Sequence, residues 1–121
     1  MSEPSNKPQF LLLLHQPNSG TAGPTPEELG KIMARFGVWM QGLNARGMVV
    51  ETNGLENTGA ILRGPRGASM TDGPFSEAKE IVGGYVLIRA ENLQEAIEAA
   101  RECPGLDYRM AVEVRPVRVR G

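Results

Sequence analysis

Apolar residues in this chain occur in short runs and alternating stretches that predict four main β-strands. Residues 9–15 (QFLLLLH) form a continuous apolar run bounded by prolines, which favours a buried central strand over a helix. Residues 48–53 (MVVETN) and 81–90 (IVGGYVLIRA) predict two more strands. In residues 110–115 the apolar positions alternate with Ala111, Glu113 and Arg115, until Pro116 interrupts the pattern. A proline there predicts a bulge or strand end at a sheet edge.

Helical spacing of apolar residues marks two further segments. Thr25 is the predicted N-cap of the first, because Pro26 suits the first helical position and Glu28 completes a capping box. Gly47 is its predicted C-terminal stop. Asn92 is the predicted cap of the second helix, with Glu95 three residues on. The apolar stripe of the first helix comprises Leu29, Ile32, Met33, Phe36, Met40 and Leu43, with Trp39 beside it.

The order of these elements predicts the fold. Residues 60–64 (AILRG) and 68–73 (ASMTDG) read as a short hairpin before the strand at 81–90. The whole order then matches an α+β, ferredoxin-like βαββαβ plan with an inserted β-hairpin. We expect residues 1–8 to be a flexible N-terminal tail and residues 9–119 to form a single domain. Both helices would cover one face of an antiparallel sheet. With no third helix predicted, we expect a second copy of the chain to cover the other face. The sequence therefore predicts a homodimer.

Composition and charge exclude several classes of protein. The chain of 121 residues is 40% hydrophobic and 22% charged with a net charge of −1, which is typical of a soluble domain. That balance gives no electrostatic footprint for nucleic acid or an anionic membrane. Cys103 is the single cysteine, so neither an intrachain disulfide nor a thiolate metal site is expected. No secretory signal is visible and no stretch approaches the ~20 apolar residues of a membrane span, which predicts a cytoplasmic protein.

One long segment carries a family resemblance. Residues 71–100 (TDGPFSEAKEIVGGYVLIRAENLQEAIEAA) contain an Asp-Gly-Pro-Phe stretch, a later Lys-Glu pair, Gly-Tyr opening a strand and a helix rich in Glu and Ala. With the closing residues 112–117 (VEVRPV), this pattern resembles the DGPF-motif proteins of the YCII-related family. The resemblance runs from about Phe10 to Val117. It implies a dimeric α+β barrel, in which two ferredoxin-like sheets pack face to face.

The predicted topology gathers candidate site residues at one end of the sheet. In a ferredoxin-like sheet the first strand and the strand at 81–90 are central, adjacent and antiparallel, so His15 would meet the region around Gly84 and Tyr85. The segment from Asp72 to Lys79 leads into the same end. A carboxylate beside an imidazole fixes its tautomer, so His15 and Asp72 form a candidate acid–base pair. Lys79, Tyr85 and Gly84 are candidate ligand-binding residues, and Lys79 favours a small anionic organic ligand.

The Asp-Gly-Pro-Phe motif can also be interpreted as purely structural. Asp72, Gly73 and Pro74 are ordinary turn residues, and Phe75 would anchor the turn in the core. Lys79 would then be a surface residue, whose ion pairs contribute little to stability.

Two functions of different class follow from these readings. The first is a small enzyme without cofactor or metal that uses acid–base chemistry on a small organic molecule in a cleft. The alternative is a non-catalytic dimer that binds a ligand or a protein partner in a regulatory role. Some relatives of the DGPF type occur with sigma-factor-like regulators, which supports the alternative, although this chain carries no such DNA-binding segment.

Overall fold

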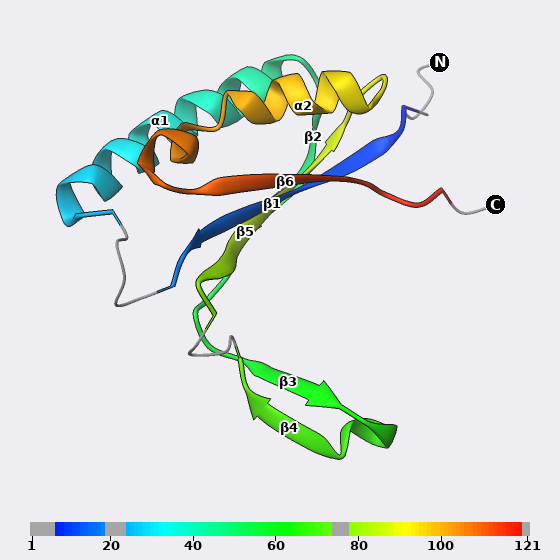
Figure 1. Cartoon of the computed structure of the whole chain (residues 1–121). Coiled ribbons are helices and arrows are strands. Elements are labelled where there is room, and N and C mark those ends of the chain that lie inside the picture. Colours follow the sequence, from blue (N-terminus) through cyan, green and yellow to red (C-terminus); the bar gives the residue numbers. More distant parts are fainter. Residues whose placement is uncertain (1–6, 19–23, 74–77, 120–121) are drawn as a thin grey trace.

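The computed structural model describes residues 7–18, 24–73 and 78–119, and it has the predicted architecture. A four-stranded antiparallel sheet is formed by β1 (Gln9–Pro17), β2 (Val49–Gly54), β5 (Glu80–Arg89) and β6 (Ala111–Pro116), in the order β2-β5-β1-β6. Helices α1 (Pro26–Ala45) and α2 (Leu93–Arg101) lie on one face of this sheet (Figure 1). The fold is therefore α+β and ferredoxin-like, as the sequence predicts.

The inserted hairpin is also present. It consists of β3 (Ala60–Arg63) and β4 (Ser69–Asp72), joined by the short 3-10 turn η1 (Pro65–Gly67). Figure 1 shows it extending away from the sheet and both helices. A second 3-10 segment, η2 (Pro104–Tyr108), links α2 to β6.

Local signals set the helix ends as expected. Thr25 accepts a hydrogen bond from the Glu28 amide at 3.1 Å, and the Glu28 carboxylate accepts one from the Thr25 amide at 3.0 Å. This is a complete capping box. At the other end Gly47 has a φ of +69°, the left-handed conformation that terminates helices. Asn92 caps α2 through a bond of 2.9 Å from the Glu95 amide. Neither helix, over the residues described, is long and apolar enough to cross a membrane.

The core lies between the helices and the covered face of the sheet. Trp39 ties the two helices together, because its buried indole Nε1 donates to the Ala99 carbonyl at 3.0 Å. Cys103 is a buried free thiol, and desolvation raises its pKa. The residues that form this core are Phe10, Leu12, Leu14, Trp39, Leu43, Met48, Val86, Ile88, Ala90, Ala96, Ala99, Ala100 and Cys103.

The predicted apolar stripe of α1 needs a correction. Ile32 and Leu43 are buried as expected, and so is Trp39, which the sequence placed only beside the stripe. Leu29 and Met33, however, are 49% and 63% exposed. The reason is that this half of α1 stands over a cavity, described below, instead of over packed side chains.

The two central strands contain a bulge where the candidate site was expected. Leu14 pairs with Gly84, but the next residue, His15, pairs with Val82, which leaves Gly83 as the extra residue of β5. A bulge of this kind bends the strand and redirects nearby side chains. At the far side of the sheet β6 is an edge strand that ends at Pro116, as predicted.

Candidate functional site

His15 lies where the predicted topology brings it, at the end of β1 beside β5 and β6. Its Cα partners are Val82 on β5 and Ala111 on β6. Side chains alternate along a strand, so His15 shares the face of Leu11 and Leu13, opposite the buried Leu12 and Leu14. We call this side, which carries no helix, the open face of the sheet.

Two carboxylates flank the His15 ring. Nε2 lies 2.9 Å from Glu113 Oε1, and Nδ1 lies 4.0 Å from Glu80 Oε1. The His15 side chain is 24% exposed, so the hydrogen bond to Glu113 is only partly shielded from water. Glu113 also faces Arg115, at 3.6 Å between Oε2 and Nη1. If the Nε2–H donates to Glu113, the Nδ1 lone pair is left to accept a proton.

A second polar cluster lies on the open face across Leu13. The Tyr85 hydroxyl donates to Glu51 Oε2 and accepts a hydrogen bond of 3.0 Å from Asn53 Nδ2. Strand register puts Tyr85 beside Leu13, and Leu13 beside Glu113. The open face therefore carries a histidine–glutamate pair and a tyrosine–glutamate–asparagine cluster on opposite sides of one leucine.

The opposite face of the same sheet end contains a cavity of about 420 Å³. Its described lining comes from α1, from β1, β2 and β5, and from the segment before β6. Apolar side chains predominate. The polar side chains on this face are the Thr52 hydroxyl and the Gln16 carboxamide, since the Asn53 carboxamide lies on the open face with Tyr85. The described lining residues are Leu14, Gln16, Pro17, Pro24, Leu29, Ile32, Met33, Phe36, Thr52, Asn53, Gly54, Gly83, Gly84 and Met110.

Two consecutive glycines make room on the wall of this cavity. A Cβ on Gly83 would clash with the carboxamide oxygen of Gln16, so the absent side chain is what lets Gln16 lie there. A Cβ on Gly84 would sit 3.1 Å from the Asn53 carbonyl oxygen, which is tighter than ordinary contact. Gly83 and Gly84 thus leave space beside the backbone at the bulge, as expected where a ligand approaches the wall of a cavity.

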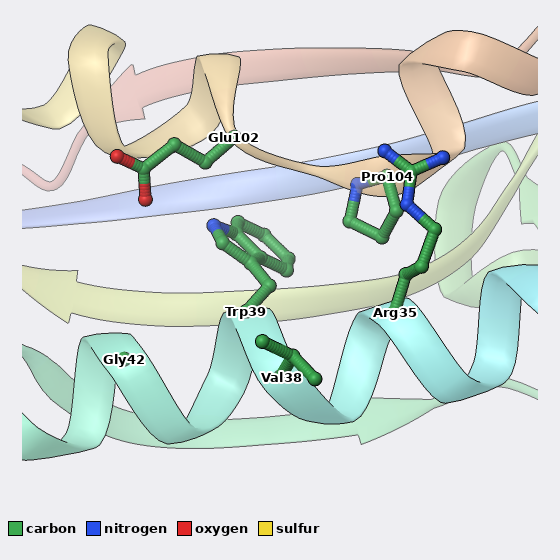
Figure 2. A pocket seen from close by; sticks show the side chains of 6 residues that line it. All are labelled: Arg35, Val38, Trp39, Gly42, Glu102 and Pro104. Atoms are coloured by element: carbon green, nitrogen blue, oxygen red, sulfur yellow. The ribbon is translucent and has the colours of Figure 1, made fainter.

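A further hollow of about 340 Å³ lies between α1 and the segment joining α2 to η2. Figure 2 shows Trp39 rising from α1 between Glu102 on one side and Pro104 and Arg35 on the other. The charged side chains that line this hollow already form ion pairs within the chain. Arg35 Nη2 donates to Asp107 at 2.7 Å, a bond that raises the Arg35 pKa, and Glu102 lies 3.6 Å from Arg46. We therefore assign this hollow to the packing of the two helices.

The predicted site residues are distributed over several surfaces. Gly84 lines the cavity on the covered face, whereas His15 and Tyr85 lie on the open face. Asp72 is exposed in β4, where it pairs with Ala60, and Lys79 is exposed directly before β5. The Lys79 carbonyl accepts a bond of 3.0 Å from the Asn18 amide. The roles of Asp72 and Lys79 in a site stay predictions.

Pro74 and Phe75, the second half of the motif, lie outside the described residues. The expectation that Phe75 anchors the core therefore also stays a prediction.

Sequence reasoning missed the residue that hydrogen-bonds to His15. Glu113 is 98 positions away, and alternation already assigned it to the polar side of the last strand. The predicted fold places that strand next to the first, so an explicit register would have indicated the pair. Gln16 was also missed, and nothing in its local sequence distinguishes it.

The described residues contain no group of three or more His, Cys, Asp or Glu side chains suited to a metal ion.

Comparison with known proteins identifies the domain. No curated protein matches the chain. The family model of the YCII-related domain matches residues 9–119, which is nearly the whole chain. The matched range contains the sheet, both helices and the hairpin. The chain therefore belongs to the YCII-related domain family.

Proposed function

We propose that this protein binds a small, neutral and mainly apolar organic molecule in the cavity on the covered face. The observation that carries the proposal is the lining: a cavity of about 420 Å³ in which no described residue is ionisable. Ligand cavities of small molecules have this size and this predominance of apolar side chains. A charged ligand would lose its hydration there without gaining a counter-charge.

The polar groups of the cavity indicate where the ligand would be oriented. Thr52 Oγ1 donates to the Tyr85 carbonyl at 2.8 Å, and Asn53 Nδ2 donates to the Tyr85 hydroxyl, so both serve the sheet. Gln16 is held against Gly83 and lines the cavity. Its carboxamide offers both a donor and an acceptor, which suits a carbonyl, hydroxyl or amide on the ligand.

A titration with neutral compounds tests this proposal. We expect neutral carbonyl or aromatic compounds from a small-molecule library to raise the melting temperature, since a ligand at a hundredfold its Kd stabilises by about 2.7 kcal/mol. Met33→Trp should narrow the cavity and weaken binding by at least tenfold, at little cost in stability because Met33 is exposed. Val38→Trp is the matched control, an exposed position on the same helix outside the cavity.

Binding of small acids is the result that would contradict a neutral ligand. If carboxylates stabilise the protein and Lys79→Ala abolishes the effect, the ligand is anionic, as the sequence led us to expect. If Met33→Trp and Val38→Trp respond alike, the ligand lies elsewhere.

A second candidate function is acid–base catalysis at His15. The observation that favours it is the bond of 2.9 Å between Nε2 and Glu113, which fixes the ring and directs Nδ1 to the opposite side. His15 is on the open face, so it would act on a molecule other than one bound in the cavity. An activity found in a substrate panel should be lost in His15→Gln and reduced in Glu113→Gln, while Gln16→Leu leaves it unchanged. Full activity in His15→Gln would remove this candidate.

We also infer that the protein is a homodimer that pairs through the open face. The support is that both helices lie on the other face, while Leu11, Leu13 and Leu87 form an apolar strip across the middle of the open one. A stable pair would bury roughly 1,200 Å² or more. Sedimentation at micromolar concentration tests the dimer, and a monomer there would exclude it.

The single free cysteine is compatible with a reducing, cytoplasmic location.

A further inference from the structure

The β3–β4 hairpin makes few contacts with the rest of its own chain. Its strands pair with each other from Ala60–Asp72 to Arg63–Ser69, and its base is closed by a bond of 3.0 Å between the Gly73 amide and the Gly59 carbonyl. Figure 1 shows both strands running outward from the end of the sheet, clear of α1 and α2. We call residues 60–72 the arm.

The arm carries an apolar pair that its own chain does not cover. Leu62 and Met70 are directly opposite each other in the register, so their side chains share one side of the arm. They are 61% and 68% exposed. The side chains of Ile61, Arg63 and Thr71 point to the other side. A two-stranded hairpin is at best marginally stable in water, so an arm of this kind needs a surface to pack against.

The arm and the open face have complementary charge. Arg63 and Arg66 against Asp72 give residues 60–72 a net charge of +1. The end of the open face next to the arm carries Glu80 and Glu113, whereas Glu51 and Arg115 share the row of Leu11 and Leu87 further along, and Arg89 lies at the far end. The arm also begins and ends at the strands of that face, since it connects β2 to β5. A second copy docked on the open face would therefore lie within reach of the arm.

We propose that the arm is a dimerisation arm that packs its Leu62–Met70 side against a second copy of this chain. Arg66, at the tip, is the residue that meets the acidic end of the partner's open face. It has a φ of 58° within the turn, where glycine is the usual residue. Its side chain is exposed at the end of the arm, where a partner can reach the guanidinium. This inference rests on the proposed homodimer and adds to it the element that reaches across.

Thiol labelling tests the packing of the arm directly. The native Cys103 is buried, so a cysteine introduced on the arm is the accessible reporter. In the dimer Met70→Cys should react at least tenfold more slowly than the adjacent control Thr71→Cys, which lies on the other side of the arm. The protection should disappear on dilution below the dimer dissociation constant. Equal labelling rates at all concentrations would overturn the proposal.

Sedimentation of charge variants tests the energetics. Met70→Asp should weaken the dimer at least tenfold, which corresponds to 1.4 kcal/mol, and Thr71→Asp should change it less than twofold. Arg66→Glu should weaken it several-fold at low salt and less at high salt, because exposed charge pairs are screened. Unchanged far-ultraviolet circular dichroism would show that each variant is folded.

The outcomes separate this proposal from the others. A wild-type dimer that Met70→Asp leaves intact, with Met70→Cys freely labelled, overturns the arm and keeps the open-face dimer. A wild-type monomer overturns both. Binding of neutral compounds in the cavity is measured on the same variants and depends on neither result.

Discussion

The two faces of one sheet are built by neighbouring residues and have opposite character. On the covered face Leu12, Val86 and Ile88 are completely buried beneath the helices. On the open face their immediate neighbours Leu11, Leu13 and Leu87 are half-buried and share the surface with charged and hydroxyl groups. Every buried polar group on a closed face must find a partner inside the chain. Within one chain the side chains of the open face can bond to water as well as to each other, so this face holds titratable groups such as His15 and Glu113.

The comparison also separates the two candidate chemistries. The covered face ends in a cavity with no ionisable residue among those described, which suits recognition of a neutral molecule. The open face holds His15 with Glu113, and Tyr85 with Glu51, which suits proton transfer or contact with a second copy. The bulge at Gly83 lies at the same end of the sheet, where two consecutive residues, Gly83 and Gly84, have no side chain.

The largest expected difference between the faces is in packing energy. Leu12→Ala should lower the free energy of unfolding by about 2–5 kcal/mol, because it leaves a cavity in a closed core. Leu13→Ala should cost less, about 1–2 kcal/mol, because its side chain is only half-buried within one chain. Urea unfolding measures both. At dilutions that dissociate a dimer, an equal loss for the two variants would contradict the distinction between the faces.

Removing a hydrogen bond should also destabilise the protein more on the covered face than on the open face, although by less than removing a core side chain. Trp39→Phe removes a buried hydrogen bond to the Ala99 carbonyl, which keeps the Glu102 amide at 3.3 Å as its other donor, so the loss should be about 0.5–1.5 kcal/mol beyond the change in packing. Tyr85→Phe removes a hydroxyl whose partners are exposed to water, so the loss should be about 1 kcal/mol or less. Urea unfolding at dilutions that dissociate a dimer compares the two variants, and a larger loss for Tyr85→Phe there would contradict the distinction between the faces.

Gly83→Ala should alter binding more than stability. The new methyl group would displace the Gln16 carboxamide, which is the flexible end of a side chain, so the loss of stability should stay within about 1 kcal/mol. Binding of neutral ligands should weaken because Gln16 no longer points into the cavity. Gly59→Ala is the control, since Gly59 is not among the cavity-lining residues and its Cβ would meet only the Gly73 carbonyl oxygen at 3.7 Å. Side-chain amide NMR signals of Gln16 report its displacement, and an unmoved signal would contradict this account.

The smallest expected effect is the pH dependence at the start of α1. A hydrogen bond from the Thr25 amide lowers the pKa of Glu28, and Arg109 at 2.9 Å lowers it further. A carboxylate with a depressed pKa in the folded state stabilises above its unfolded pKa of about 4.3 and loses that contribution as the pH falls. Glu28→Gln should therefore flatten the acid limb of the stability curve. Parallel curves for Glu28→Gln and the wild type would refute this.

Local patterns determined most of the fold from the sequence alone. The helix-end signals depend on residues within a few positions of each other, so they can be recognised without a structure. They are the capping box at Thr25, the cap at Asn92 and the stop at Gly47. The strands and the hairpin follow from hydrophobic period and turn residues in the same way. The order of elements then predicted the sheet, and the sheet predicted that His15 would lie beside the region around Gly84 and Tyr85.

Only the tertiary structure decided which residues share a surface. Glu113 reaches His15 because β6 lies beside β1 in one particular register, and a shift of a single residue would turn it to the other face. Leu29 and Met33 have the same helical spacing as the buried residues, yet they are exposed because they line a cavity and do not pack against the sheet. Periodicity specifies which side of an element is apolar. What that side meets depends on contacts between residues far apart in the chain, and those contacts form only when the chain has folded.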